Sequence, residues 1–317
     1  MKIVCDQYIP FLVETVRKGW PEVEIYPMKP EEIDASAVHD ADVLVIRTRT
    51  KANAELLRGS SVRLVCTATI GYDHIDTAWL DAQGIRWTAC PGCNAQAVCD
   101  YIEEVLEELP AFSLSLPLNA SSIGIVGVGH VGTLVARMAE RRGLTVLLND
   151  PPKGIGESLD SIAQKCDIIT FHTPLTHEGE YPTYHLCDEA FLAKTKSETL
   201  IINAARGGIV DEQALLRSGR PFVLDTWEGE PHISPEVARA AQRASMHIAG
   251  YSLEGKRNAT GMCLDAIAEK FRLPQLSCVP SSLSHGDNTP GWLERVSRQL
   301  QSSPQQFEYL RKQYVLR

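Results

Sequence analysis

A glycine-rich segment, Gly127-Val-Gly129-His-Val-Gly132, constrains the fold of this chain more than any other feature of its sequence. It lies between an apolar run that predicts a strand, Ile123 to Val128, and a run with helical spacing, Thr133 to Arg142. In such a unit the first glycine permits a tight turn, the second lets a pyrophosphate approach the backbone, and the third allows close packing of helix on strand. The helix N-terminus adds amides and a favourable dipole. We therefore predict a dinucleotide site here.

An acidic residue at the end of the following predicted strand indicates which dinucleotide is bound. The strand Thr145 to Leu148 is followed by Asn149 and Asp150. A carboxylate at this position binds the hydroxyls of the adenine ribose and repels a 2′-phosphate, which predicts NAD rather than NADP as the cofactor. An ordinary turn with a capping Asp150 is the alternative, but it does not explain the strand, the glycines, the helix and the acid together.

Apolar runs alternate with runs of helical spacing along the chain, as is typical of parallel sheets covered by helices on both faces. The predicted strands form two groups. The first group is Lys2 to Cys5, Val23 to Tyr26, Val43 to Ile46, Val62 to Cys66 and Arg86 to Ala89. The second is Ile123 to Val128, Thr145 to Leu148, Asp167 to Phe171, Leu200 to Asn203, Phe222 to Leu224 and Ile248 to Ala249. We predict an α/β fold of two Rossmann-like, doubly wound parallel-sheet domains plus a short C-terminal extension.

The segments between and after these groups predict the domain boundaries. Helical spacing over Ala97 to Leu109 predicts a helix that leads from the first domain to the second, and Leu116 to Ser122 resembles a linker. Near the C-terminus, Trp292 to Leu300 and Gln305 to Tyr314 are predicted helices. The boundaries are therefore 1–96 rejoined by 251–270 for the first domain, 97–250 for the second, and 271–317 for the extension.

Composition argues against several classes of function. The 317-residue chain has a formal net charge of −9 and a sequence pI near 5.5, whereas nucleic-acid binders usually carry a basic stripe. No segment approaches the apolar length of a membrane span, and the N-terminal decapeptide lacks the features of a secretion signal. Nine cysteines scattered through predicted strands and loops fit a reducing compartment. We expect a cytoplasmic protein with no nucleic-acid and no membrane partner.

Three polar motifs, NAARGG, DTWEGEP and HIAGY, each follow a predicted strand of the second group. Ligands of parallel sheets bind beyond the carboxyl ends of the strands, so Arg206, Glu230 and His247 are expected to share one cleft. Hydride transfer from an alcohol needs a proton acceptor at the oxygen, which suits a histidine oriented by a carboxylate, while arginine binds a substrate carboxylate with two N–H groups. Singly, each residue has an ordinary structural alternative. Behind a dinucleotide motif, we favour catalysis.

Further strings carry a resemblance to one known family. They are Met1-Lys-Ile-Val with Asp6 and Pro10, Arg47-Thr48 with Thr50-Lys51, Thr67-Ala-Thr69 with Gly71 and Asp73-His-Ile-Asp76, Pro91-Gly-Cys-Asn94, Asp150-Pro-Pro152, Phe171-His-Thr173-Pro-Leu175, Trp227-Glu-Gly-Glu230-Pro231 and His247-Ile-Ala-Gly-Tyr251-Ser-Leu-Glu-Gly-Lys256. They resemble the D-isomer-specific 2-hydroxyacid dehydrogenases. The last string is the most discriminating and resembles the member that oxidises 4-phospho-D-erythronate at C2 on the route to pyridoxal phosphate. We expect the same reaction here.

The resemblance assigns roles to individual residues. It makes Arg206, Glu230 and His247 the catalytic set, with His247 accepting the C2 hydroxyl proton as hydride leaves for NAD. It implies substrate contacts at Thr48, Thr69 and Tyr251, and cofactor contacts at Gly127, Gly129, Gly132, Asp150, Thr173, Asp225 and Gly250. The first domain becomes a flavodoxin-like substrate domain, the second the NAD-binding Rossmann domain, and 271–317 a shortened dimerisation-like segment. A homodimer that acts on a phosphorylated 2-hydroxy acid is therefore expected.

The substrate residues of the first domain also have an interpretation from position alone. Thr48 and Thr69 follow predicted strands, so their hydroxyls and nearby amides can face a carboxylate or phosphate, and a plain turn hydrogen bond is the alternative. Arg47 and Arg49 add positive charge for the phosphate. Because neighbours on a strand face opposite sides, at least one of these arginines is expected to point elsewhere.

The chain departs from the family at several places. Met246 stands where proline commonly precedes the catalytic histidine, so this loop lacks a fixed φ. The predicted helix Ala97 to Leu109 has an acidic face where relatives are mostly apolar at a subunit contact, and we expect that face to be solvated. The C-terminal segment is shorter than in the family. We hypothesise that Arg311 or Lys312 in it reaches the substrate phosphate. The acids of the helix are Glu103, Glu104, Glu107 and Glu108.

Other motifs of the sequence have structural interpretations, and two other functions fit the same scaffold. Cys90-Pro-Gly-Cys93 has the spacing of a redox or zinc pair but lacks a second pair, so no metal is expected. We expect His74 and Asp76 to serve in capping and packing. We expect His172 to be a structural residue at a strand end and Trp227 to pack in the core. Two alternative functions remain open: another D-2-hydroxyacid dehydrogenase, such as 3-phosphoglycerate dehydrogenase or hydroxypyruvate reductase, and a non-catalytic NAD-responsive protein resembling the corepressors of this family.

Overall fold

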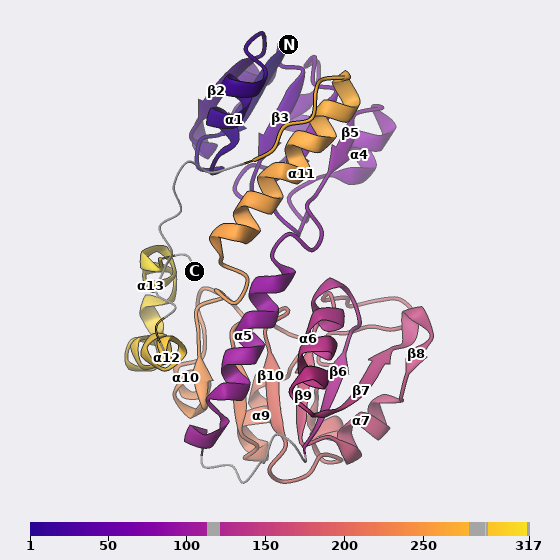
Figure 1. Cartoon of the computed structure of the whole chain (residues 1–317), viewed down its shortest axis with the longest axis vertical. Helices are drawn as coiled ribbons and strands as arrows, with labels where there is room; N and C mark the ends of the chain where they lie inside the picture. The colour runs from indigo at the N-terminus through magenta and orange to yellow at the C-terminus, as the bar shows by residue number, and fades with distance from the viewer. Residues whose placement is uncertain (113–120, 279–288, 290, 316–317) are drawn as a thin grey trace. The chain divides into compact units, whose positions relative to one another are not determined.

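The computed structural model describes residues 1–112, 121–278, 289 and 291–315. The chain forms two compact units, each with its own sheet and helices (Figure 1). Unit 1 comprises Met1–Asn94 and Ser252–Ser284, and unit 2 comprises Ala95–Tyr251 and His285–Arg317. Within the described residues, no helix is long and apolar enough to cross a membrane.

Unit 1 is built on a five-stranded parallel sheet in the order β2-β1-β3-β4-β5. Successive strand residues are buried on opposite faces, as Ile3 and Val4 show, because side chains alternate along a strand and both faces are covered. One face packs on the long helix α11 through Cys263 and Ile267. The strands are β1 (Lys2–Asp6), β2 (Glu24–Met28), β3 (Val43–Ile46), β4 (Leu64–Thr67) and β5 (Arg86–Thr88), and the helices α1 (Leu12–Gly19), α2 (Ala35–Val38), α3 (Ala54–Leu57), α4 (Thr77–Ala82) and α11 (Leu253–Phe271).

Unit 2 is built on a seven-stranded sheet in the order β12-β11-β10-β9-β6-β7-β8. The chain order reverses where β6 lies between β7 and β9, which is the switch point beside which doubly wound folds bind ligands. All pairings are parallel except β7 with β8. The strands are β6 (Ser122–Val126), β7 (Thr145–Asp150), β8 (Ile155–Gly156), β9 (Ile168–Phe171), β10 (Leu200–Asn203), β11 (Phe222–Leu224) and β12 (Arg243–Ala244).

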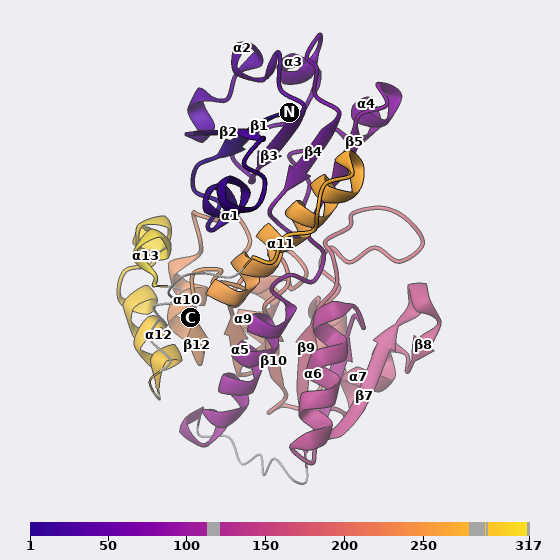
Figure 2. The same cartoon turned by 45° about the horizontal axis from the view of Figure 1, so that its top comes forward.

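Helices cover both faces of this sheet, and Figure 2 shows α5 and α6 together on one of them. The C-terminal helices α12 and α13 belong to the same core, where Trp292, Leu300 and Phe307 are buried. Whether this segment mediates dimerisation stays a prediction. The helices are α5 (Ala95–Glu107), α6 (His130–Arg141), α7 (Leu159–Lys165), α8 (Glu189–Leu192), α9 (Glu212–Ser218), α10 (Pro235–Ala240), α12 (Trp292–Ser302) and α13 (Phe307–Gln313).

The structure confirms the predicted α/β class with parallel sheets and corrects several elements. The strand predicted at Ile248 to Ala249 is wrong: both residues lie in a loop, because their amides bond to the buried carboxylate of Asp225 instead of a neighbouring strand. The last strand is instead Arg243–Ala244, and β8 was not predicted. Of the predicted linker Leu116 to Ser122, residues 116–120 lie outside the described part of the chain, and Ser122 begins β6.

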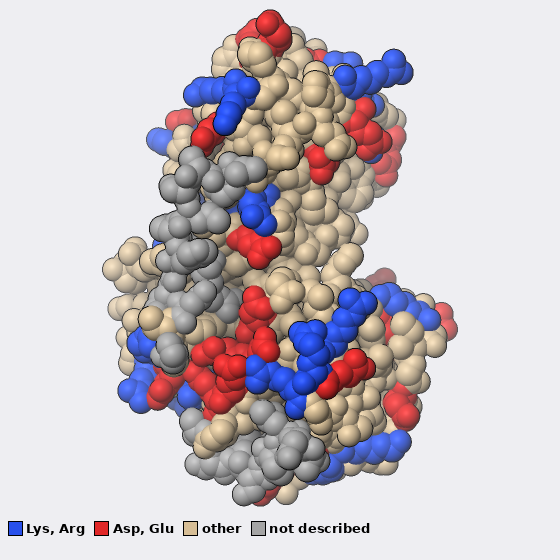
Figure 3. All heavy atoms as spheres, viewed as in Figure 1, with Lys and Arg blue, Asp and Glu red and all other residues tan. Residues whose placement is uncertain are grey.

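The acidic face of α5 also differs from expectation. Glu103 and Glu107 lie 2.8 and 2.5 Å from Arg142, which follows α6. Glu108 pairs with Arg243 of β12, and only 11% and 12% of these two side chains are exposed. Figure 3 shows acidic side chains over α5 beside basic ones over α6. The expectation of a solvated face is wrong for Glu108, which is nearly buried against Arg243, whereas Glu107 is exposed and Glu103 partly exposed while both pair with Arg142.

Candidate active site

The glycine loop, residues 127–132, follows β6 and enters α6. Gly127 has φ +92°, and a Cβ there would lie 2.8 Å from the His172 carbonyl oxygen. A Cβ on Gly132 would lie 2.0 Å from the Gly127 carbonyl oxygen, so the helix approaches the turn too closely for a side chain. No heavy atom lies within 4 Å of a Cβ built on Gly129. The loop therefore presents open backbone at Gly129 and closed packing at its two ends.

Asp150 at the end of β7 lies against this loop. Its Oδ2 accepts the Val128 N–H at 2.9 Å and lies 3.5 Å from the Nζ of Lys153. Lys153 also donates to the Val128 carbonyl oxygen at 2.6 Å. Lys153 was not among the predicted site residues, although its position three residues after Asp150 places it near the carboxylate. The pair leaves the predicted ribose-binding carboxylate partly neutralised.

A cavity of about 520 Å³ opens between the glycine loop, the end of β7 and the loop after β9. Gly127, Gly129, Asp150 and Thr173 line it, and the Thr173 hydroxyl is buried with no hydrogen-bond partner in the described structure. Burial lowers the pKa of His172, which also lines the cavity, to about 3, so this imidazole is neutral near pH 7. A mostly apolar cavity with open backbone, a carboxylate and an unused hydroxyl fits a dinucleotide.

Glu230 and His247 form a direct hydrogen bond. The Nδ1 of His247 lies 2.8 Å from Oε2 of Glu230, and Oε1 of the same carboxylate accepts the Trp227 N–H at 2.8 Å. Because a carboxylate accepts, Nδ1 carries the proton of the neutral ring and Nε2 is left to exchange one. His247 has φ +57°, in the left-handed region, and its side chain is 31% exposed. This is a histidine held in one orientation with one reactive nitrogen.

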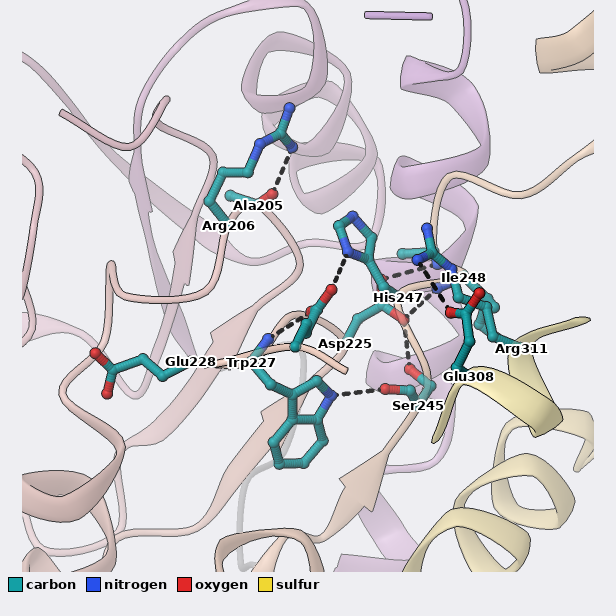
Figure 4. Close-up of polar contacts among 12 residues, drawn as sticks. Ala205, Arg206, Asp225, Trp227, Glu228, Ser245, His247, Ile248, Glu308 and Arg311 are labelled. Carbon is teal, nitrogen blue, oxygen red and sulfur yellow. Dashed lines mark hydrogen bonds and ion pairs between the residues drawn. The ribbon is translucent and has the colours of Figure 1, made fainter. Parts of the chain in front are cut away.

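Asp225 fixes the loop that carries His247. This buried carboxylate at the end of β11 accepts the amides of Ile248 at 2.7 Å and Ala249 at 2.9 Å, together with the hydroxyl of Ser245 at 2.7 Å (Figure 4). Asp225 is not among the described residues that line the cavity, so its predicted cofactor contact stays a prediction. Its supporting role was not predicted, because the partner amides lie in a segment that the sequence had assigned to a strand.

Arg206 follows β10 on a loop packed against that of Glu230. A Cβ on Gly207 would lie 1.9 Å from the Trp227 carbonyl oxygen, so the two backbones touch. The guanidinium of Arg206 is exposed and donates to the Ala205 carbonyl at 2.8 Å. In Figure 4 the side chains of Arg206 and His247 extend in the same direction from their loops. The three predicted catalytic residues therefore stand on loops after neighbouring strands of one sheet.

Tyr251 lies at the end of the loop that carries His247, and its ring stacks on a cation from the C-terminal segment. The Arg311 guanidinium of α13 lies 5.2 Å from the centroid of the Tyr251 ring and 3.9 Å from Glu308. Lys312 is more exposed and pairs with Glu308 at 3.5 Å. Of the two cations hypothesised to reach a phosphate, Arg311 is therefore the one beside a predicted substrate residue.

In unit 1, the predicted substrate residues also stand at strand ends. Thr48 is exposed after β3, and Thr69 follows β4 with its hydroxyl on the Gly71 carbonyl at 2.9 Å. Arg47 does not stand free for a phosphate, because it bonds Asp6 at 2.7 and 3.2 Å. Arg49 is exposed.

The remaining motifs have structural surroundings. Cys90 is buried with its Sγ 3.7 Å from that of Cys263, and this contact together with burial raises the pKa of the Cys90 thiol. Burial raises the pKa of Cys93 to about 12. Within the described ranges, no group of three or more His, Cys, Asp or Glu residues is placed to hold a metal. His74 bonds the Thr67 hydroxyl at 2.9 Å, and Asp76 caps α4.

Comparison with known proteins indicates the class of protein to which this chain belongs. Residues 103–249 match the NAD-binding domain of the D-isomer specific 2-hydroxyacid dehydrogenases. The structure of NAD⁺-bound 3-phosphoglycerate dehydrogenase from Entamoeba histolytica superimposes with a TM-score of 0.71 at 23% identity, covering 86% of this chain and 95% of that one. The fold, the cavity and the histidine–carboxylate pair define an NAD-dependent dehydrogenase of small 2-hydroxy acids.

Two full-length relatives narrow the assignment. The erythronate-4-phosphate dehydrogenase of Bacteroides fragilis is 42% identical over 339 aligned positions, which cover 100% of this chain and 97% of the relative. That of Bacteroides thetaiotaomicron is 41% identical with the same coverage. The chain belongs to the erythronate-4-phosphate dehydrogenase family. The family, cofactor and enzyme class predicted from the sequence are thereby confirmed.

Proposed function

We propose that this enzyme oxidises 4-phospho-D-erythronate at C2 to 2-oxo-3-hydroxy-4-phosphobutanoate, with NAD as oxidant, on the route to pyridoxal 5′-phosphate. The observation that carries the substrate is the full-length identity to relatives of that name. The Glu230–His247 pair at 2.8 Å supports the chemistry. We further propose a cytoplasmic homodimer.

The proton and the hydride of the substrate alcohol need separate acceptors. Gly127, Gly129, Asp150 and Thr173 would hold NAD, which when bound would supply the oxidant for the hydride of C2. The C2 hydroxyl proton passes to Nε2 of His247, because Nδ1 is already bonded to Glu230. As His247 gains that proton it becomes an imidazolium, and the Glu230 carboxylate 2.8 Å away stabilises the positive charge. The cationic Arg206 is proposed to polarise the oxygen at C2 as the carbonyl forms.

The two anionic ends of the substrate need separate cations. The exposed guanidinium of Arg206 suits the C1 carboxylate and the C2 oxygen, because a planar fork binds two oxygens at once. Arg311, stacked on Tyr251, is proposed to bind the C4 phosphate. Thr48 and Thr69 of unit 1 stay predicted substrate contacts.

A steady-state comparison tests the substrate. NADH formation is measured with 4-phospho-D-erythronate and with 3-phosphoglycerate. In the reverse direction, NADH consumption is measured with hydroxypyruvate. We expect kcat/KM to be highest for 4-phospho-D-erythronate by at least about a hundredfold, the discrimination that unpaired polar groups in a site can produce. Preference for 3-phosphoglycerate or hydroxypyruvate would assign another 2-hydroxy acid. Turnover on none of them, with NAD still bound, would favour the NAD-responsive binding protein.

Arg311 tests the phosphate separately. The variant Arg311→Ala is expected to raise KM for 4-phospho-D-erythronate by about tenfold or more and to leave KM for NAD unchanged, because it removes one charged contact to the substrate. Lys312→Ala is the matched control on the same helix. An unchanged KM in Arg311→Ala would remove Arg311 from the substrate site.

A further inference from the structure

A buried glutamate outside the proposed catalytic set supports the loop that carries Glu230. We infer that Glu212 is a positioning residue: through its hydrogen bond to the amide of Glu228 it holds the loop Trp227 to Pro231, and so sets Glu230 against His247. The inference concerns the dehydrogenase chemistry and rests on the proposed roles of Glu230 and His247, whichever 2-hydroxy acid is the substrate.

The contact of Glu212 with the loop is short and lies in the interior. Glu212 is the first residue of α9, and only 4% of it is exposed. Its Oε1 accepts the N–H of Glu228 at 2.6 Å. Hydrogen bonds to a carboxylate are stronger than those between neutral groups, and a buried acceptor has no water to replace the lost donor. The bond therefore fixes the backbone two residues before Glu230.

The other contacts of this loop act on the same stretch of backbone. The Trp227 N–H donates to Glu230 at 2.8 Å, and the Trp227 indole donates to the Ser245 carbonyl at 2.8 Å. The side chain of Glu228 turns away from His247 in Figure 4 and binds Nε2 of His185 at 2.7 Å. Glu228 is therefore held by both its amide and its carboxylate, which restrains the loop at this residue.

Charge makes a purely stabilising role for Glu212 a poor explanation. Burial raises the pKa of Glu212 to about 7, and the negative charges of Glu228, Glu230 and Asp211 add to this rise, while the hydrogen bond from the Glu228 amide opposes it. Two of these neighbours contact His185: Glu228 lies 2.7 Å from its Nε2, and Asp211 lies 3.9 Å from its Nδ1. The third, Glu230, is bonded to His247. No ion pair in the described structure includes Glu212. A buried carboxyl among acids is costly for folding, and the one hydrogen bond that it makes to the loop is to the amide of Glu228.

Two substitutions separate positioning from bulk packing. Glu212→Met keeps the volume but removes the acceptor, and it is expected to lower kcat by about ten- to a hundredfold with little change in KM for NAD or the acid, because Glu230 then shifts relative to His247. Glu212→Gln keeps an acceptor oxygen and is expected to restore kcat to within about threefold of wild type. Both are assayed with the 2-hydroxy acid that the wild-type enzyme oxidises best.

A matched control removes a buried hydrogen bond elsewhere in unit 2. Thr199 is fully buried before β10 and donates to the Cys166 carbonyl at 3.1 Å, at the opposite end of the strand from Arg206. Thr199→Val is expected to lower the melting temperature and leave kcat unchanged. If Glu212→Met does not fold, Glu212→Asp replaces it, since it withdraws the oxygen by one methylene and keeps the charge.

A second readout needs no substrate. The Nδ1 proton of His247, bonded to Glu230, is expected to give a downfield proton resonance in the free enzyme, which His247→Asn would identify by its loss. We expect Glu212→Met to shift or broaden this resonance and Glu212→Gln to retain it. An unchanged resonance and unchanged kcat in Glu212→Met, or equal losses in Met and Gln variants, would overturn the inference. Failure of the substrate proposal alone would change the preferred acid and leave these differences in place.

Discussion

The glycine loop and the three loops that follow β10, β11 and β12 form two parts of unit 2 that are built by different means. The glycine loop is one continuous segment whose shape follows from close backbone contacts at Gly127 and Gly132. The strand-end loops, residues 204–208, 225–231 and 245–251, come from separate segments and are held by buried side chains such as Asp225 and Glu212. One region is set by sterics within a few residues. The other is set by tertiary hydrogen bonds.

This difference predicts how each region responds to substitution. In the glycine loop a change should alter stability or cofactor affinity, because no side chain there takes part in proton transfer. In the strand-end loops a change should alter kcat, because the contacts serve the relative position of Glu230 and His247. The following experiments test that division.

The largest effect is expected at His247. His247→Asn should lower kcat by about a thousandfold, within the usual contribution of a general base, and leave the affinity for NAD unchanged. Asparagine is the appropriate substitute because it tolerates the left-handed backbone found there. The measurement is steady-state NADH formation beside NAD titration by fluorescence. Activity near that of the wild type would remove His247 from the reaction.

A smaller loss, in stability, is expected at Gly132. Gly132→Ala places a Cβ 2.0 Å from the Gly127 carbonyl oxygen and should lower the unfolding free energy by about 3 kcal/mol, the upper range for overpacking. Gly129→Ala is the control, since its Cβ meets no heavy atom within 4 Å. Urea titration should show little change in Gly129→Ala, whereas NAD affinity should fall. Equal stability of the two variants would contradict the close packing.

The pH dependence of stability tests Glu212, the buried acid of α9 that contacts the strand-end loop of Glu228. Glu212 has its pKa raised from 4.5 to about 7 in the folded protein, so its contribution to stability is full below about pH 4.5 and is lost as the pH rises through 7. Relative to Glu212→Gln, the wild type should therefore lose about 2 to 3 kcal/mol between pH 5 and pH 8. Urea midpoints at both pH values measure this. If the unfolding free energies of the wild type and of Glu212→Gln change with pH in the same way, the Glu212 carboxyl is not buried as described.

The smallest effect is expected at the cofactor carboxylate. Asp150→Ser should weaken NAD binding by about tenfold and narrow the preference for NAD over NADP, because one charged hydrogen bond and its repulsion of a 2′-phosphate are lost. Lys153→Ala should increase the preference for NAD over NADP. Lys153 lies 3.5 Å from the same oxygen and partly neutralises the charge that repels a 2′-phosphate. Dissociation constants for both cofactors decide this. An unchanged ratio in Asp150→Ser would place the ribose elsewhere.

The same division explains what could be predicted from the sequence. The glycine loop was predictable because a strand, three glycines and a helix specify each other over a short stretch. The positions of Arg206, Glu230 and His247 at one edge followed from the parallel sheet. The contacts that hold them did not follow. Glu212 meets Glu228 and Ser245 meets Asp225 only after folding, and nothing in either local pattern names its partner.

The wrong predictions have a similar cause. Ile248 and Ala249 have the apolar character of a strand, but the Asp225 carboxylate takes their amides. Glu108, directly after α5, was also expected to be solvated, but it is nearly buried against Arg243 of β12, which is distant in sequence. In each case a charged side chain that is distant in sequence determines the local structure or the burial of the residue.

The two edges of the unit 2 sheet bear on how copies of this chain can associate. Both edge strands, β8 and β12, are only two residues long. Beside β12, the amide of Ala244 is bonded to the hydroxyl of Ser297 on α12 at 2.9 Å. Edges this short offer few backbone groups for a second sheet to extend. Subunits of the proposed homodimer would therefore meet through side-chain surfaces and not by continuing this sheet from one copy into the next.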